Sequence, residues 1–215
     1  MSNRKTPTSF RTLKEAQAVS YTLSNPSKMP GRGYSIPAVL CQVGSKLRKV
    51  KDSVCSSCYA LKGRYVFRNV QDAMERRYQS LDHPLWVEAM AFQISHYAAK
   101  GEKFFRWHDS GDLQSTEHLR KICAVAELTP EVSHWLPTRE FGIVDNYTGK
   151  VPDNLIIRVS APIIGTRLKK SKFPTSTVSY AESDYHCPAY TQGGFCGECR
   201  ACWDPKVSNV NYPLH

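Results

Sequence analysis

Seven of the eight cysteines fall into two groups whose spacing is typical of metal ligands. The first group is Cys41, Cys55 and Cys58, and the second group is Cys187, Cys196, Cys199 and Cys202. Cysteine thiolates select soft or borderline metals, and consecutive C-x-x-C steps let sulfurs reach different irons of one cluster. We therefore predict that all seven residues are metal ligands and that the cofactor is a 4Fe-4S cluster, present once or twice.

The second group contains four ligands within sixteen residues, including a Cys-Pro step and two overlapping C-x-x-C steps. This spacing resembles the runs that bind a cubane cluster. Zinc is the alternative metal, because four thiolates also complete a closed tetrahedral site. Free thiols or a redox-active disulfide are the remaining alternative.

The first group offers three thiolates, which would leave one iron of a cubane without a protein ligand. An open iron could coordinate a substrate or the amino and carboxylate groups of S-adenosylmethionine. In the alternative interpretation, these cysteines join His108, an aspartate or a tail cysteine in one closed site. Cys123 lies on the apolar stripe of a predicted helix, so we expect it in the core.

A polar cluster directly follows an aromatic run that is predicted to be a strand. His108 and Asp109 are the candidate catalytic residues, because imidazole and carboxylate groups transfer protons near neutral pH. Gly111, Asp112 and Ser160 are the candidate cofactor-binding residues. The alternative is a helix-entry turn in which the aspartates cap backbone N–H groups.

The elements that would position these residues alternate between strand and helix patterns. Residues 1–33 are expected to form a loosely packed lead-in, and residues 42–57 are expected to form a loop. Helices are predicted over 84–100 and after Ser115, and strands over 34–40, 103–107, 132–136, 155–160 and 176–180. This order predicts an α/β fold with a mostly parallel sheet, arranged as an open partial (βα) barrel. In such folds, chemistry gathers at the carboxyl ends of the strands.

A length of 215 residues suits one compact unit. We expect residues 1–180 to form a βα partial-barrel domain that carries the N-terminal cysteine loop. Residues 181–215 are expected to form a cysteine-rich, metal-binding tail packed on the same domain.

The net charge of +10 favours an anionic partner, such as a nucleic acid or a nucleotide. The alternative is an ordinary solvated surface, because the basic residues form no single stripe. No apolar stretch is long enough for a membrane span, and the first residues lack the apolar region of a secretion signal. We therefore expect no membrane partner and a cytoplasmic location, where thiols stay reduced.

Several motifs resemble the phage-encoded gene-eighty-eight product family, and the resemblance covers most of the chain. It rests on residues 25–30 (NPSKMP), 55–60 (CSSCYA), 107–112 (WHDSGD), 187–188 (CP), 196–203 (CGECRACW) and 212–215 (YPLH). It implies a phage origin and therefore the host cytoplasm as the location.

The chain is also distantly similar to radical S-adenosylmethionine enzymes, whose partial barrels place a three-cysteine loop after the first strand. That similarity implies cofactor contacts at residues 110–112 and at Ser160. Those enzymes usually carry C-x-x-x-C-x-x-C, whereas thirteen residues separate Cys41 from Cys55 here. The leading hypothesis is an iron-sulfur enzyme of this kind acting on an anionic or nucleic-acid-related substrate. The alternatives are a non-enzymatic metal-stapled module that binds nucleic acid or a host protein, and an electron carrier.

Overall fold

The computed structural model describes residues 9–183 and 185–214, and its centre is a six-stranded sheet. The strands are β1 (Gly33–Tyr34), β2 (Phe104–Trp107), β3 (Ser133–Thr138), β4 (Leu155–Ser160), β5 (Thr175–Val178) and β6 (Asn209–Tyr212). They lie side by side in the order of the sequence, and every neighbouring pair is parallel. The predicted α/β class with a parallel sheet is therefore confirmed.

Of the α-helices in the described residues, α1 comes before β1, and the others lie in the crossovers between β1 and β4. They are α1 (Leu13–Ser20), α2 (Gln42–Leu47), α3 (Arg68–Ser80), α4 (Trp86–Ala98), α5 (Thr116–Leu128) and α6 (Phe141–Asp145). The predicted helices over 84–100 and after Ser115 correspond to α4 and α5, and the Ser115 side chain caps α5 by accepting from the backbone N–H of His118. None of the helices in the described residues is both long and apolar enough to cross a bilayer.

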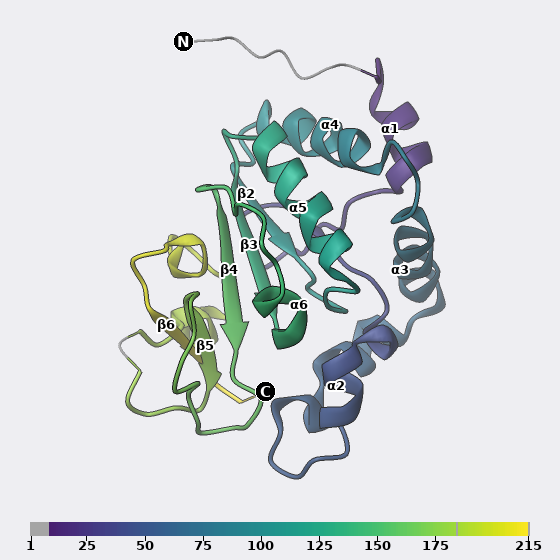
Figure 1. The fold of residues 1–215 in the computed structure, drawn as a ribbon. Coiled ribbons are helices and arrows are strands. Elements are labelled where there is room, and N and C mark those ends of the chain that lie inside the picture. Colours follow the sequence, from purple (N-terminus) through teal and green to yellow (C-terminus); the bar gives the residue numbers. More distant parts are fainter. Residues whose placement is uncertain (1–8, 184, 215) are drawn as a thin grey trace.

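One face of the sheet packs against α4 and α5, which lie across the strands in Figure 1. Alternate residues of three central strands supply this main core, among them Phe105, Leu136 and Ile157. All three are at most 2% exposed, so this face is closed to solvent. The period of two that sets this pattern is the normal alternation of side chains along a strand.

The opposite face of the sheet is covered by residues from the C-terminal part of the chain. A second, smaller core forms there from Trp135, Ala201, Cys202, Trp203 and Val210. The Trp203 indole donates a hydrogen bond of 3.0 Å to the backbone carbonyl of Phe105, which ties the tail to β2. Strand β6 also belongs to this part of the chain and pairs with β5, so the sheet continues across residue 180.

The N-terminal region differs from the expected loose lead-in, of which residues 1–8 lie outside the described part. Helix α1 begins after Thr12, which forms a capping box with Glu15. Ala16 is fully buried and packs with Phe10 and Ala89, which belongs to α4. The prediction was wrong because a short helix with few apolar residues gives a weak periodic signal, although the capping box is visible in the sequence.

The first strand and the loop that follows it also differ from the prediction. Strand β1 ends at Tyr34 rather than near residue 40, and Pro37 comes before a short 3-10 helix, Ala38–Leu40. Proline lacks the N–H that a strand interior needs, so the ladder cannot continue through it. The predicted loop over 42–57 contains α2 and a 3-10 helix at Val54–Ser57.

Candidate cofactor site

The first cysteine group lines a cavity of about 110 Å³ at the carboxyl ends of β2, β3 and β4. Cys41, Cys55 and Cys58 reach it from the segment that follows β1, and α2 lies near the arrowhead end of the sheet in Figure 1. The other side of the cavity consists of residues at the ends of these strands and in the segments that follow them, and most of these residues are polar. They include Arg106, His108, Asp109, Ser110, Gly111, Asp112, Thr138, Arg139 and Ser160.

Two short helices hold the cysteines in place. Cys41 is the residue before α2, and Cys55 lies in a 3-10 helix that Ser53 caps by accepting a hydrogen bond from the Ser56 N–H. Backbone hydrogen bonds join this segment to the chain after β4, from Val54 N–H to the carbonyl of Pro162 at 2.9 Å. The cysteine segment is thereby anchored to the sheet edge.

Gly44 leaves the space that the cysteine side chains surround. A Cβ atom at this position would lie 2.9 Å from the Cys41 Cβ, 3.7 Å from the Cys41 Sγ and 3.6 Å from the Cys55 Sγ. A larger residue at position 44 would therefore clash with the Cys41 Cβ, whereas the two sulfurs lie at ordinary van der Waals distance. Glycine thus allows α2 to pack closely against Cys41.

Cys41 and Cys55 are protonated at neutral pH unless a cation compensates them. Burial, together with smaller contributions from Asp112 and Cys58, raises the pKa of Cys41 to about 12. Burial also raises the pKa of Cys55, while Arg139 opposes that change. Metal binding requires thiolates, so a bound metal would have to supply the positive charge that displaces these protons.

Glu140, which follows β3, fixes the start of α2. Its Oε1 atom accepts hydrogen bonds from the backbone N–H groups of Gln42 and Val43, at 2.8 and 2.9 Å. The side chain is 3% exposed, so both bonds are shielded from water. Sequence analysis did not single out this role, since the two partners are 98 and 97 residues away.

Asp112, a candidate cofactor-binding residue, joins the ends of β2 and β3. Its Oδ1 accepts from the Thr138 hydroxyl at 2.6 Å and from the Leu113 N–H at 2.8 Å, and its Oδ2 accepts from the Arg139 N–H at 2.9 Å. Burial raises its pKa to about 6, and these hydrogen bonds oppose that rise. The carboxylate therefore shapes the cavity wall.

The other two candidate cofactor-binding residues also line the cavity. Gly111 has a φ of +78°, and a Cβ there would lie 2.4 Å from Cγ1 of Ile36. Only glycine suits this close packing of the turn after β2 against the segment after β1. Ser160 ends β4, and its Oγ accepts a hydrogen bond of 2.9 Å from the Ser176 hydroxyl.

His108, the first candidate catalytic residue, is a buried neutral imidazole. Its ring lies beside Tyr34, Trp107 and His118, and neither ring nitrogen has a hydrogen-bond partner among the described residues. Burial holds its pKa well below the usual value, so the ring is uncharged at neutral pH. Its φ of +54° is uncommon for a residue with a side chain and marks a constrained turn.

Asp109, the second candidate catalytic residue, has one oxygen available. Its Oδ2 accepts from the Tyr65 hydroxyl at 3.3 Å, whereas its Oδ1 is buried without a partner in the described part of the chain. Burial raises its pKa, and Arg106 and Arg77 oppose that change.

Arg106 and Tyr59 are cavity residues that sequence analysis missed. Arg106 donates a hydrogen bond of 3.1 Å to the Tyr59 hydroxyl, and its guanidinium lies 4.7 Å from the centre of the Trp135 ring. An arginine inside an aromatic strand is a signal that could have identified it. The cavity has five lining residues with buried polar atoms that lack partners in the described chain, namely Arg106, His108, Asp109, Ser110 and Arg139. Buried polar groups are normally paired, so this concentration is typical of a ligand site.

The second cysteine group lies on the face of the sheet that the tail covers, away from the cavity. Cys202 Sγ is 3.1 Å from the Tyr212 hydroxyl, and Cys199 Sγ is 3.0 Å from the Tyr185 hydroxyl. Cys202 is 9% exposed and belongs to the second core.

The four thiols of this group are also neighbours of one another. Burial raises the pKa of Cys196, and the nearby Cys187 and Cys199 raise it further. None of the four lines the cavity, so the two cysteine groups form separate clusters. Cys123 is buried in the main core at 3% exposure, as predicted.

All eight cysteines are free thiols. Within residues 9–183 and 185–214, no three His, Cys, Asp or Glu side chains lie close enough together to hold a single metal ion. The predicted metal binding is therefore not supported by the arrangement of these side chains.

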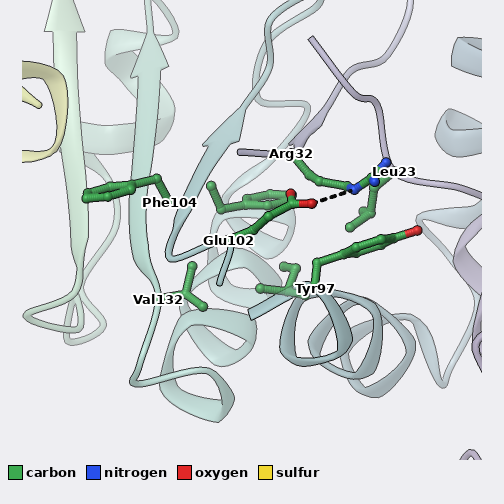
Figure 2. Close-up of a pocket in the computed structure, with 8 residues that line it drawn as sticks. Leu23, Arg32, Tyr97, Glu102, Phe104 and Val132 are labelled. Atoms are coloured by element: carbon green, nitrogen blue, oxygen red, sulfur yellow. Dashed lines mark ion pairs between the residues drawn. The ribbon is translucent and has the colours of Figure 1, made fainter. Parts of the chain in front are cut away.

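A much smaller hollow lies at the opposite end of β2 (Figure 2). Its volume is about 10 Å³, which leaves room for one water molecule at most. Arg32 and Glu102 form an ion pair of 3.5 Å beside it, and the Arg32 guanidinium lies 3.8 Å from the centre of the Tyr97 ring. This hollow is too small for a ligand.

Fold and site together define an α/β protein with a polar, cysteine-lined cavity at the carboxyl edge of a parallel sheet. The family model described as gene product 88 matches residues 1–205. The chain therefore belongs to this family, the phage gene-product family that its motifs resemble. A search of curated proteins found no match, and a search of solved structures found none.

Proposed function

We propose that this protein binds 4Fe-4S clusters and that its N-terminal cluster is open for a small ligand. Cys41, Cys55 and Cys58 would hold the open cluster, and the four tail cysteines would hold an auxiliary one. The observation that carries the proposal is the convergence of three free thiols on a cavity whose other wall has unpartnered buried polar groups. Three thiolates leave one iron of a cubane without a protein ligand, and the cavity gives a ligand access to it.

Iron-sulfur is favoured over zinc by the spacing of the cysteines in the sequence. Cys196, Cys199 and Cys202 lie within seven residues, which is less typical of a closed tetrahedral zinc site. A cubane distributes its ligands over several irons, which suits two overlapping C-x-x-C steps.

S-adenosylmethionine is our proposed ligand of the cavity. Among the described residues, one Asp109 carboxylate oxygen has no partner and is open to an amino group, and the Nε–H groups of Arg106 and Arg139 have none and are open to a carboxylate. A reduced cluster with an open iron would supply an electron to the ligand that it binds. His108, Gly111, Asp112 and Ser160 would shape the cavity around that ligand. In this proposal the sequential parallel strands form the open partial barrel of a radical S-adenosylmethionine enzyme.

The cluster proposal is tested by anaerobic purification followed by iron and sulfide analysis and an absorption spectrum. We expect a brown protein that contains both elements in equal amounts. Replacing Cys41, Cys55 and Cys58 by serine should remove about half of the iron, since each cubane holds four irons. Cys123→Ser is the matched control and should leave the iron content unchanged. A colourless protein that contains zinc and no iron would refute the proposal.

The ligand proposal is tested by EPR spectroscopy of the reduced protein. S-adenosylmethionine should shift the signal of the N-terminal cluster, and the Asp109→Asn variant should need a higher concentration for the same shift. A spectrum that does not respond, in a protein that contains its iron, would rule out the enzymatic part of the proposal. The protein would then be assigned as a non-enzymatic iron-sulfur module.

A further inference from the structure

The segment that carries Cys55 and Cys58 also carries a dense positive charge. Residues 46–68 contain seven lysines and arginines and one acidic residue, Asp52. Six of these cations are exposed: Lys46, Lys49, Lys51, Lys62, Arg64 and Arg68. None of the six forms an ion pair with any residue in the described ranges. Their charge is therefore uncompensated by the protein and is available to a partner.

Two exposed aromatic residues, Tyr59 and Phe67, lie in the same segment of the chain as these cations. Tyr59 is 47% exposed, although its hydroxyl is held by a hydrogen bond of 2.6 Å to the carbonyl of Asp109 and by Arg106 at 3.1 Å. Tyr65 packs against it with ring centres 5.6 Å apart. Phe67, which lies eight residues after Tyr59, is 57% exposed. Tyr59 also lines the cavity, so a fixed and partly exposed ring lies at its edge.

We propose that this surface, named here the basic aromatic surface and defined by the six cations with Tyr59 and Phe67, binds single-stranded nucleic acid. Lysine and arginine neutralise backbone phosphates, and exposed rings stack on bases that a single strand leaves accessible. An acidic protein partner would bind to the cations but would not require exposed aromatic rings, so the rings favour a nucleic acid. This inference rests on the proposed function in one respect. The bound nucleic acid can be the substrate of the cluster only if the cavity holds the cluster.

Binding is tested on the full-length, anaerobically purified protein by fluorescence anisotropy. The probes are a labelled single-stranded DNA of mixed sequence, the same strand as a duplex, and polyglutamate. We expect the single strand to bind more tightly than the duplex, with polyglutamate a weak competitor. Equal affinity for the strand and the duplex, or competition by polyglutamate at equal charge, would overturn the proposal in favour of a charge-driven contact.

A charge-reversal variant locates the interface. Lys46, Lys49 and Lys51 are replaced together by glutamate, and Lys14, Lys150 and Lys206 are exposed lysines elsewhere that receive the same change as a matched control. The first variant should bind at least tenfold more weakly, and the slope of log K against log salt should fall by about 2, at roughly 0.7 per lost phosphate contact. Equal losses in both variants would show that net charge alone acts and would overturn the location.

An aromatic variant tests stacking. Phe67→Leu should weaken binding between about fivefold and about 150-fold, which corresponds to the loss of one base stack. Tyr190→Leu removes a ring that is 65% exposed in the tail and should have no effect. Equal binding by Phe67→Leu and by the wild type would contradict a stacking role for this ring.

Iron and sulfide are measured on every sample, so that the two proposals fail independently. A protein without iron that binds the single strand would refute the cluster and support the surface. An iron-loaded protein that does not bind the strand would refute the surface and leave the cluster proposal intact.

Discussion

At the scale of single residues, two buried carboxylates hold the segments around the cavity in place. The Glu140 side chain accepts hydrogen bonds from two backbone N–H groups in the first turn of α2, the helix that directly follows Cys41. Asp112 accepts hydrogen bonds from Thr138 and Arg139 and so holds the end of β3. The position of the first cysteine therefore depends on a residue that is distant in the sequence and follows β3.

We predict that Glu140→Ala lowers the free energy of unfolding by about 2 kcal/mol, because two shielded N–H groups lose a charged acceptor. Glu140→Gln keeps one acceptor oxygen and should lose less. Urea denaturation measures both, and Glu131→Ala, at an exposed position, is the control. If Glu140→Ala and the control had the same midpoint, Glu140 would not hold α2.

His134 gives a prediction about pH. Burial lowers its pKa to about 3 from the ordinary 6.5. Between these values the unfolded chain binds a proton that the folded chain excludes, so His134 makes stability fall as the pH decreases through this window. Its contribution is at most about 1.4 kcal/mol per pH unit.

The measurement compares urea denaturation of wild type and His134→Gln between pH 7 and pH 4. The loss of stability on acidification should be smaller in the variant, since its side chain does not titrate. His118 and Asp112 titrate in both proteins and cancel in the comparison. Parallel pH curves for the two proteins would show that folding leaves the pKa of His134 near its ordinary value.

At the scale of elements, one arginine connects β4, β5 and the tail. Arg158 is fully buried and donates hydrogen bonds of 3.0 to 3.2 Å to the backbone carbonyls of Thr175, Ala201, Asp204 and Val207. A guanidinium can reach four acceptors because its donors form a rigid fork. The covered face of the sheet thus depends on this side chain as much as on apolar packing.

We predict that Arg158→Met destabilises the protein by about 3 kcal/mol or more, since it leaves buried carbonyls without donors. Arg158→Lys should also destabilise it, because an ammonium cannot satisfy four acceptors in this geometry. Thermal denaturation provides the measurement, and Arg68→Met, at an exposed position, should leave the melting temperature nearly unchanged. Full stability in Arg158→Lys would show that charge alone is sufficient there.

At the scale of the whole molecule, two cores of unequal size lie on opposite faces of one sheet. The main core contains most of the buried apolar residues, whereas the second consists of Trp135 and four residues of the tail. The smaller core should therefore depend more on the metal proposed for the tail cysteines.

Removing that metal with a chelator under reducing conditions should loosen the tail while the main core stays folded. Hydrogen–deuterium exchange should increase in residues 185–207 and remain slow in β3 and β4. Cooperative loss of protection in all strands would show instead that both cores unfold as one unit. Unchanged exchange in the tail would count against a metal at the second cysteine group.

Local features of the sequence determined which elements form and what chemistry they carry. Periodicity located α4, α5 and β4, and their alternation indicated a parallel sheet, because both depend on neighbouring residues of one segment. Cysteine spacing separated two groups of thiols from Cys123 for the same reason.

Only the tertiary structure decided which groups meet. Glu140 reaches the start of α2 across nearly a hundred residues, Arg106 lines the cavity of the first cysteine group, and the tail covers the second face of the sheet. Such contacts depend on how separate segments pack, which local spacing does not encode. Helix α1 lies between the two cases, since its capping box is local but its burial depends on α4.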